Sequence, residues 1–526
     1  MPVDPRTPVL IGYGQVNHRG DIDAEKQSIE PVDLMAAAAR KAADSTVLEA
    51  VDSIRVVHML SAHYRNPGQL LGERIKARTF TTGYSGVGGN MPQSLVNRAC
   101  LDIQRGRAGV VLLAGAETWR TRTGLRAKGS KLEWTVQDES VPLPDMAGDD
   151  VPMAGAAELR INLDRPAYVY PIFEQALRIA YGESIENHRK RIGELWARFS
   201  AVAADNPHAW IRNPVTADEI WQPGPQNRMV SWPYTKLMNS NNMVDQGAAL
   251  LLTSVERATR LRIPAERWVY PQAGTDAHDT PAVADRHRLH RSTAIRIAGA
   301  RALELAGLGL DDIEYVDLYS CFPSAVQVAA IELGLDTDDP ARPLTVTGGL
   351  TFAGGPWSNY VTHSIATMAE LLAANPGRRG LITANGGYLT KHSFGVYGTE
   401  PPSEFRWEDM QPAVDREPTG DGLVEWEGIG TVEAWTTPVN RDGQPEKAFL
   451  AVRTPARRVA QLGRDHRSRI GASNGARGHR RRQGCRRPRR HRDPAIAGGQ
   501  HESRSRSNGR ASDTDVPIVM RRRWGR

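Results

Sequence analysis

The sequence predicts an α/β protein built from two related, layered halves. Three observations favour this class. Apolar runs of strand length alternate with helical patterns, the alternation starts again after residue 260, and polar or glycine-rich loops follow several strands. Such alternation predicts a mostly parallel sheet in each half. With 526 residues, the chain is long enough for a large core and for more than one domain.

The first half covers residues 1–260, and its elements follow from the spacing of apolar residues. Residues 109–117, GVVLLAGAE, are apolar throughout, as a strand buried on both faces requires. The predicted elements, in order, are a helix over residues 32–45, a strand over 51–60, a helix over 90–105, the strand 109–117 and a further buried strand over 247–258.

The second half covers residues 261–400 and repeats the scheme. A helix and a loop come first, and a strand that ends in a polar loop follows. The predicted elements are the helix and loop over residues 292–313, a strand over 314–322, helices over 323–335 and 361–375, and a strand over 379–387.

Two segments depart from this alternation. Residues 120–245 are rich in Trp, Pro, Asn and Arg, and we expect them to form a long loop insertion that covers the mouth of the site. Residues 401–455 predict the start of a small β-domain, because two β-type runs flank NRDGQPE, whose Asp-Gly pair is typical of a hairpin turn. The composition changes abruptly after this segment.

Residues 456–526 form an Arg-rich tail with 21 Arg, no Lys and 5 Asp or Glu, so the net charge of +7 belongs to the tail and the rest of the chain is acidic. The tail has almost no aromatic or branched apolar residues, which predicts disorder. Its Arg, Gly, Pro, Ala, His and Ser content favours a frameshift of a GC-rich gene. An inert tail and a nucleic-acid-binding arm are the alternatives.

Composition excludes several other classes. No apolar run reaches the roughly 18 residues of a membrane span. The first residues lack the pattern of a signal peptide, so we expect a cytoplasmic protein. The chain has three Cys, too few for a disulfide framework, and no Cys-x-x-Cys pair indicates zinc, so no metal site is predicted.

Four loops at predicted strand ends carry the candidate site: GVGGNMPQ, YSCF, GGLTFAGGP and NGGYLTKHS. Open α/β sheets bind ligands beyond the carboxyl ends of their strands. In the first loop, the helix that starts near Gly89 and Asn90 presents N–H groups able to hold a carbonyl oxygen or an anion. This loop lacks the Gly-Lys-Ser/Thr of a nucleotide P-loop.

At these motifs the sequence resembles the thiolase superfamily, most closely the sterol-carrier-protein type of thiolase, over roughly residues 5–400. GRAGVVLLAGAE resembles the thiolase strand that ends in Gly-Gly-Met-Glu, and VDQGAALLL resembles the Asp-Gly-Ala-Ala strand. IEYVDLYSCF is similar to the segment that ends in Asn-Glu-Ala-Phe or His-Asp-Cys-Phe. GGLTFAGGP is similar to the loop that ends in Gly-His-Pro. Their order and spacing imply a thiolase-like fold.

The resemblance also implies where catalytic residues would lie. Thiolases use a Cys nucleophile in the first loop, a second Cys as acid and base, and a His in an oxyanion hole. By position these fall on Gly89, Asn385 and Gly355, and the first residue of the Asn-Glu-Ala-Phe motif falls on Tyr319. Neither glycine has a side chain, and an amide exchanges no proton near pH 7. The usual thiolase mechanism is therefore not expected.

Other side chains near these loops are candidates for different chemistry. We single out Tyr319, Cys321 and His392 as candidate catalytic residues. Cys100 and His363 are expected to be structural. The candidate substrate-binding residues are Gly89, Asn90, Tyr319, Gly355 and Asn385.

The resemblance leaves two functions open, and it does not decide whether the chain is an enzyme. The first is an acetyl-CoA acetyltransferase-like protein that binds acyl-CoA or lipid acyl groups without standard thiolase turnover. The second is an acyltransferase or carbon–carbon lyase of lipid metabolism that uses non-standard residues. CoA or acyl-CoA is the implied ligand, with no covalently bound cofactor. Thiolases dimerise near the first loop, so the resemblance leaves open a homodimer as well as a separate partner subunit. Nucleic acid is not the expected partner.

Overall fold

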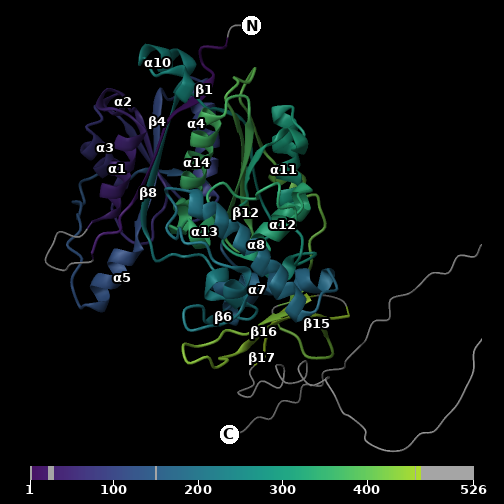
Figure 1. The fold of residues 1–526 in the computed structure, drawn as a ribbon. Helices are drawn as coiled ribbons and strands as arrows, with labels where there is room; N and C mark the ends of the chain where they lie inside the picture. Colours follow the sequence, from purple (N-terminus) through teal and green to yellow (C-terminus); the bar gives the residue numbers. More distant parts are fainter. Residues whose placement is uncertain (1–2, 22–28, 149–150, 424, 456–457, 464–526) are drawn as a thin grey trace, which may run out of the picture.

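The computed structural model describes residues 3–21, 29–148, 151–423, 425–455 and 458–463. Within these residues two β-sheets are separated by a layer of helices, and each sheet is covered by helices on its outer face (Figure 1). The predicted α/β class with two layered halves is confirmed. Two buried hydrophobic clusters form the core, one of which extends from the first half into the second.

The first half contains a six-stranded sheet with the order β1-β8-β4-β2-β3-β5. β8 is antiparallel to its neighbours β1 and β4, whereas the other pairs are parallel. The sheet is therefore mixed and not mostly parallel as predicted, because β8 runs antiparallel to both of its neighbours. Its strands are β1 (Pro8–Asn17), β2 (Ser53–Val56), β3 (Thr81–Ser85), β4 (Val110–Thr118), β5 (Asp145–Ala147) and β8 (Asp245–Ser254).

The second half contains a five-stranded sheet with the order β10-β11-β12-β9-β13. A tight turn joins β11 to β12, so these neighbours are antiparallel and this sheet is also mixed. Its strands are β9 (Tyr270–His278), β10 (Tyr315–Asp317), β11 (Arg379–Gly386), β12 (Lys391–Gly398) and β13 (Arg406–Asp409). Because β13 belongs here, the second half continues beyond the predicted boundary at residue 400.

Helices α4 (Met91–Gln104) and α14 (Tyr360–Ala374) lie between the two sheets and contact strands of both. α4 starts directly after the first loop, so Gly89 lies at the end of the middle layer, between the two halves. Helices also cover the two outer faces (Figure 1). These are α1 (Pro31–Ala42), α2 (Ser45–Glu49), α3 (Pro67–Ile75) and α10 (Val255–Arg260) on the first half, and α11 (Thr293–Ala306) and α12 (Pro323–Leu333) on the second.

The insertion at residues 120–245 contains several helices joined by irregular stretches, which the sequence did not predict. Its apolar residues recur at helical spacing, and α7 and α8 bury Phe173, Trp196 and Phe199. The helices pack on α12 and on α13 (Gly349–Phe352), which places them over the loops of the second half. The elements are α5 (Trp119–Ala127), α6 (Ala156–Arg160), α7 (Pro166–Ala180), α8 (Ile185–Asp205), α9 (Ala217–Trp221), β6 (Met229–Ser231) and β7 (Tyr234–Thr235).

The C-terminal segment forms a four-stranded sheet with the order β14-β17-β16-β15. The predicted hairpin is confirmed, because β15 (Thr431–Thr436) and β16 (Ala448–Arg453) pair in antiparallel fashion. β14 (Gly422–Leu423) and β17 (Arg458–Gly463) complete the sheet, and α15 (Gln411–Val414) precedes it. The sheet thus extends beyond the predicted end at residue 455. Residues 464–526, most of the predicted tail, lie outside the described part of the chain.

The chain covers the outer edge of its own strand β3. β5 pairs with β3 in parallel, with Tyr84 opposite Met146. A second copy that paired along β3 would have to displace β5. We therefore expect a monomer in size-exclusion chromatography with light scattering. A stable dimer at micromolar concentration would contradict this expectation.

Candidate functional site

The loops predicted to form the site meet between the two sheets. Gly89 lies between β3 and α4, Tyr319 follows β10, and Asn385 lies near the end of β11. A Cβ atom built on Gly89 would lie 2.2 Å from the Tyr319 hydroxyl oxygen and 2.5 Å from the Asn385 carbonyl oxygen. The sequence prediction that these three residues share one site is therefore consistent with the geometry.

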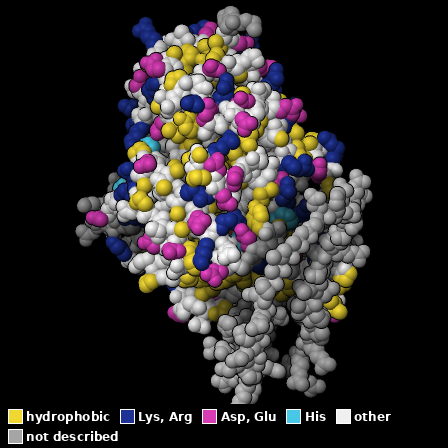
Figure 2. Space-filling view, turned by 45° about the vertical axis from the view of Figure 1, so that its right-hand side comes forward, with side chains coloured by type: hydrophobic (Ala, Val, Ile, Leu, Met, Phe, Trp, Pro, Cys, Tyr) yellow, Lys and Arg dark blue, Asp and Glu magenta, His cyan; other side chains and the backbone are white. Residues whose placement is uncertain are grey.

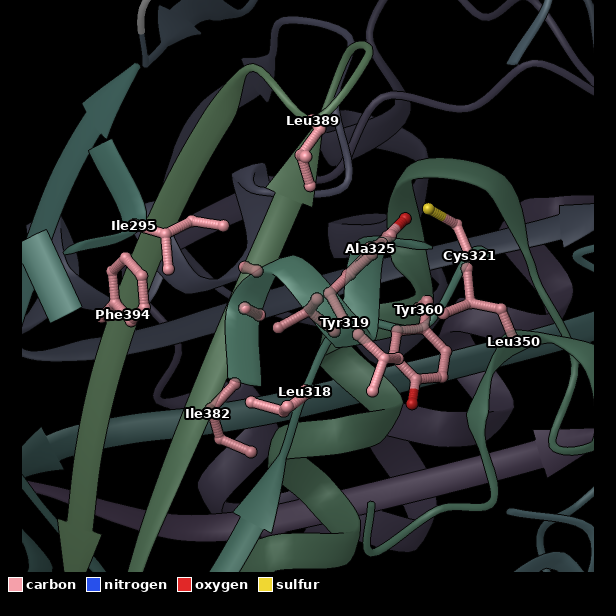
Figure 3. Packing of buried hydrophobic residues seen from close by; sticks show 14 of the residues in the cluster. Ile295, Leu318, Tyr319, Cys321, Ala325, Leu350, Tyr360, Ile382, Leu389 and Phe394 are labelled. Carbon is pink, nitrogen blue, oxygen red and sulfur yellow. The ribbon is translucent and has the colours of Figure 1, made fainter. Parts of the chain in front are cut away.

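The Tyr319 side chain fills the space where a nucleophile at position 89 would lie. Only 8% of Tyr319 is exposed, and its ring packs edge-on against Tyr360 with 5.5 Å between the ring centres. Both residues belong to the buried cluster that also contains Cys321 (Figure 3). Burial raises the pKa of Tyr319 well above its ordinary value, so this residue is a neutral phenol at physiological pH.

Asn385 is held by a residue of the insertion that the sequence analysis did not single out. Its Nδ2 donates to the Tyr170 hydroxyl oxygen over 2.9 Å and lies 3.8 Å from the Cys321 sulfur. The Leu389 N–H also donates to Tyr170, whose ring stacks on Phe322. The Asn385 Oδ1 atom is buried and finds no hydrogen-bond partner among the described residues.

Cys321 lies within the site but has the properties of an unreactive thiol. The residue is buried, and burial raises the pKa of its thiol to about 12. Thiolate is the nucleophilic form, so little of it exists at pH 7. Cys100 is buried on α4, as expected for a packing residue, and burial raises the pKa of its thiol as well.

His392 faces the same small cavity as Tyr319 and Asn385. It pairs with Asn385 across β11 and β12, and its Nε2 lies 3.7 Å from Asp279. Burial lowers the pKa of His392 to about 4, which makes the imidazole neutral at pH 7. Within the described structure, Nε2 forms no hydrogen bond. The cavity has about 10 Å³ for the centre of a water molecule, roughly the space that one water needs.

Gly355 is linked to the residues around Tyr319 and Cys321 through Ser240. Its N–H donates to Asn241 over 2.9 Å, and a Cβ atom built on it would lie 3.3 Å from Ser240. Ser240 in turn donates to the Cys321 carbonyl oxygen. A small side chain at position 355 therefore requires only a slight shift of Ser240, whereas one at position 89 would overlap Tyr319 and the β11 backbone.

Three further polar residues lie near the loops. Asn90 caps α4 but makes no side-chain capping bond, and its buried Oδ1 has no partner in the described part of the chain. His363 is hydrogen-bonded to Gln15 over 2.9 Å, and burial lowers its pKa to about 3, which supports the predicted structural role. Lys391, which no sequence motif indicated, is a buried lysine whose Nζ donates to the Val87 carbonyl oxygen and so connects the first loop to β12.

Glu117, at the end of β4, anchors the chain beside the site. Its carboxylate accepts the N–H groups of Leu60 and Ser61 over 2.7 and 2.8 Å. Burial raises the pKa of this carboxyl to about 7 from an ordinary 4.5, and the hydrogen bonds from Ser61 and Leu60 act in the opposite direction. Glu117 therefore exchanges its proton close to physiological pH.

We expect Glu117 to make stability depend on pH. A carboxyl whose pKa is raised in the folded state contributes stability below pH 4.5, and this contribution is lost as the pH rises to about 7. The free energy of unfolding should fall by about 2 kcal/mol between pH 5 and 7, relative to Glu117→Gln. Urea unfolding of both proteins across this range measures the difference. Parallel pH profiles would contradict the assignment.

Comparison with known proteins identifies the family. Residues 409–482 match the family model described as the thiolase-like protein type 1 additional C-terminal domain. The chain is 32% identical to a monomeric SCP2-thiolase-like protein type 1 from Mycobacterium smegmatis. The match covers 88% of this chain and 93% of that structure, with a TM-score of 0.74. An Ltp2–ChsH2(DUF35) aldolase shares the fold, with 19% identity, a TM-score of 0.55 and coverage of 75% of this chain and 98% of that one.

A curated relative gives a more distant match. The chain is 27% identical over 214 residues to an acetyl-CoA acetyltransferase of Methanothermobacter thermautotrophicus, which covers 38% of this chain and 53% of that protein. The chain spans about half the length of the curated relatives it matches. No helix in the described residues is long and apolar enough to cross a membrane. Fold, site position and the Mycobacterium smegmatis relative together show that the chain belongs to the thiolase superfamily, as an SCP2-thiolase-like protein.

Proposed function

We propose that this protein binds acyl-CoA or a lipid-linked acyl group at the four-loop site without thiolase turnover. The observation that carries the proposal is the position of Tyr319. Its hydroxyl lies 2.2 Å from where the Cβ of a nucleophile at position 89 would be. The family chemistry begins with a covalent bond at that position, and here the space belongs to a neutral phenol.

The narrow cavity sets a condition on binding. It leaves about 10 Å³ for the centre of a water molecule, which is the space that one water needs, and an acyl group is larger. Because the Tyr319 hydroxyl oxygen occupies the space beside Gly89, an acyl group reaches Gly89 only when the Tyr319 side chain moves. Among the described residues, Oδ1 of Asn385 and Nε2 of His392 have no hydrogen-bond partner, so both can accept from a donor on the ligand.

Calorimetric titration with acetyl-CoA, combined with an assay for thioester loss, tests this proposal. We expect measurable binding, no thiolysis above the buffer rate, and tighter binding by Tyr319→Ala, since alanine leaves space for the acyl group. Tyr319→Phe serves as the control because it keeps the ring. Thioester consumption by the wild-type protein would overturn the proposal.

A second candidate is an acyltransferase or carbon–carbon lyase with non-standard residues. The position of His392 favours it, because the imidazole faces the same cavity as Tyr319 and its Nε2 forms no hydrogen bond with the described residues. The pKa of Cys321 argues against a thiolate role for that residue. Turnover of an acyl-CoA substrate that is lost in His392→Ala and kept in Cys321→Ala would favour this candidate.

The cellular context also remains a proposal. A role in lipid metabolism and a cytoplasmic location fit the expected ligand, and cell fractionation with an antibody against the chain tests the location. A partner subunit is a further proposal, supported by the two-protein complex among the structural relatives.

A further inference from the structure

A second cavity lies beside the loop that contains Gly355, between the middle helical layer and the first sheet. Residues of β1, β8, α14 and this loop line it. It leaves about 10 Å³ for the centre of a water molecule, the space that one water needs. The surface drawn in Figure 2 shows no comparable concentration of polar groups, because basic and acidic side chains are interspersed on it. The side chains around the cavity, by contrast, are buried and held in defined orientations.

His363, on α14, presents an unprotonated nitrogen to this cavity. Its Nδ1 lies 2.9 Å from Gln15 Oε1, and the Gln15 amide nitrogen donates to Thr367 over 3.0 Å. The Gln15 oxygen is therefore an acceptor, which places the hydrogen of the imidazole on Nδ1. Nε2 is then the acceptor nitrogen of the ring. This nitrogen is buried and has no hydrogen-bond partner among the described residues, so neither bulk solvent nor the protein satisfies it.

Gln246, on β8, presents a second acceptor to the same cavity. Its Nε2 donates to Asn17 Oδ1 over 2.9 Å and to the Ala353 carbonyl oxygen over 3.0 Å, which fixes the orientation of the amide. Its Oε1 lies against Gly354, 2.2 Å from the position that a Cβ atom on this glycine would take. In the described part of the chain, this buried oxygen has no hydrogen-bond partner. Gln246 thus binds the loop through its nitrogen and leaves its oxygen unpaired.

Two buried acceptors around one small cavity define the ligand that fits it. A buried acceptor that forms no hydrogen bond destabilises the folded state, whereas a molecule that donates to both acceptors satisfies them. The two atoms cannot satisfy each other, because neither His363 Nε2 nor Gln246 Oε1 carries a hydrogen. The space admits one molecule of the size of water. The ligand is therefore a small molecule or ion with at least two hydrogens to donate.

We propose that this cavity is a binding site for one hydrogen-bond donor of the size of water, which donates to both His363 Nε2 and Gln246 Oε1. Water and the ammonium ion share this chemistry. The bound donor connects α14 to β8 beside Gly354, and it thereby holds the loop that contains Gly355. This inference does not rest on the proposed function, because the site takes no part of an acyl-CoA ligand.

X-ray crystallography of the full chain, crystallised without ammonium salts, tests the site directly. We expect an electron-density peak in the cavity within about 2.7–3.2 Å of both His363 Nε2 and Gln246 Oε1. A peak that contacts only one of these atoms, or no peak at all, would show that the proposal is wrong. Rotation of either side chain onto another group of the protein would also overturn it.

Two substitutions of His363 separate the bound donor from the contact with Gln15. His363→Asn keeps an amide nitrogen near the place of Nδ1 and removes Nε2, whereas His363→Gln puts an oxygen near the place of Nε2 and removes the donor to Gln15. We expect amide hydrogen exchange in residues 347–357 to be about 5-fold faster in His363→Asn than in His363→Gln, the effect of one hydrogen bond. His63→Asn, the same change at an exposed position, should exchange like the wild type. Equal rates in the two His363 variants, or faster exchange in His363→Gln, would contradict the role of the bound donor.

Thermal unfolding in equal concentrations of ammonium chloride and tetramethylammonium chloride identifies the donor. Tetramethylammonium has no N–H group, so it controls for ionic strength. Among the described residues that line the cavity there is no carboxylate to compensate a buried cation, so we expect equal melting temperatures in the two salts, which assigns the donor as water. A higher melting temperature in ammonium chloride for the wild type, but not for His363→Asn, would assign the same site to ammonium.

Discussion

Gly89→Cys is expected to restore no thiolysis and to destabilise the protein by about 3 kcal/mol, at the upper end of the usual cost of overpacking. The added side chain meets the Tyr319 hydroxyl oxygen at 2.2 Å and the Asn385 carbonyl oxygen at 2.5 Å, and the second atom belongs to the backbone of β11. Chemical denaturation measures the stability, and a thiolysis assay measures turnover.

Gly224→Cys is the control for this experiment. A Cβ atom built on Gly224 meets no atom within 4 Å, so the same chemical change at that position should leave stability unchanged. Adding Tyr319→Ala to Gly89→Cys should recover part of the lost stability but no activity, because positions 355 and 385 still lack the His and Cys of the family. Measurable thiolysis by Gly89→Cys alone would show that the remaining site is more intact than we conclude.

Glu174→Ala is expected to lower the free energy of unfolding by about 3–5 kcal/mol, the usual cost of removing one partner from a buried ion pair. The Glu174 carboxylate is fully buried and binds three side chains of the insertion and α12. It accepts from His188 over 2.5 Å, Tyr234 over 2.6 Å and Gln327 over 2.7 Å. Without Glu174, each of these three side chains loses one hydrogen bond inside the core. Urea unfolding measures the loss.

The same carboxylate should make stability sensitive to acid. Burial raises the pKa of Glu174, but the hydrogen bonds from His188, Tyr234 and Gln327 outweigh burial, so the pKa lies below its usual value. A depressed pKa contributes stability above pH 4.5, and this contribution is lost as the pH falls through the folded-state pKa. Glu194→Ala, at an exposed position on α8, should change neither the unfolding midpoint nor its pH dependence. A small effect of Glu174→Ala would contradict the role of this network.

The fold was predictable because its signals are local. The continuous apolar run of β4, the helical spacing in α4 and the Asp-Gly hairpin between β15 and β16 each follow from a short stretch of sequence. The helices of the insertion were not predicted, since its Trp, Pro and Asn content hid the helical spacing of α7 and α8. β13 and β17 were not predicted, because a short strand is stabilised mainly by pairing with a neighbouring strand, and that neighbour is distant in the sequence.

Which side chains occupy the site depends on contacts between residues that are far apart in the sequence. Position 89 is visibly without a nucleophile in the sequence, but only the structure shows the Tyr319 hydroxyl filling the space of the missing side chain. Tyr170 and Lys391 were missed for the same reason, because each acts through one hydrogen bond to a loop far away in the chain. The residue types at positions 89, 355 and 385 indicated that the thiolase catalytic groups are absent. The packing shows that the Tyr319 side chain occupies the space of the missing nucleophile.

The central claim is that acyl-CoA binds here without forming a covalent intermediate. Native mass spectrometry of the full chain incubated with acetyl-CoA tests it most directly, because the same spectrum reports complex and adduct. We expect a peak at the mass of the intact protein–acetyl-CoA complex, which dissociates under denaturing conditions to unmodified protein. An acetyl adduct that survives denaturation, or release of free CoA, would contradict the account.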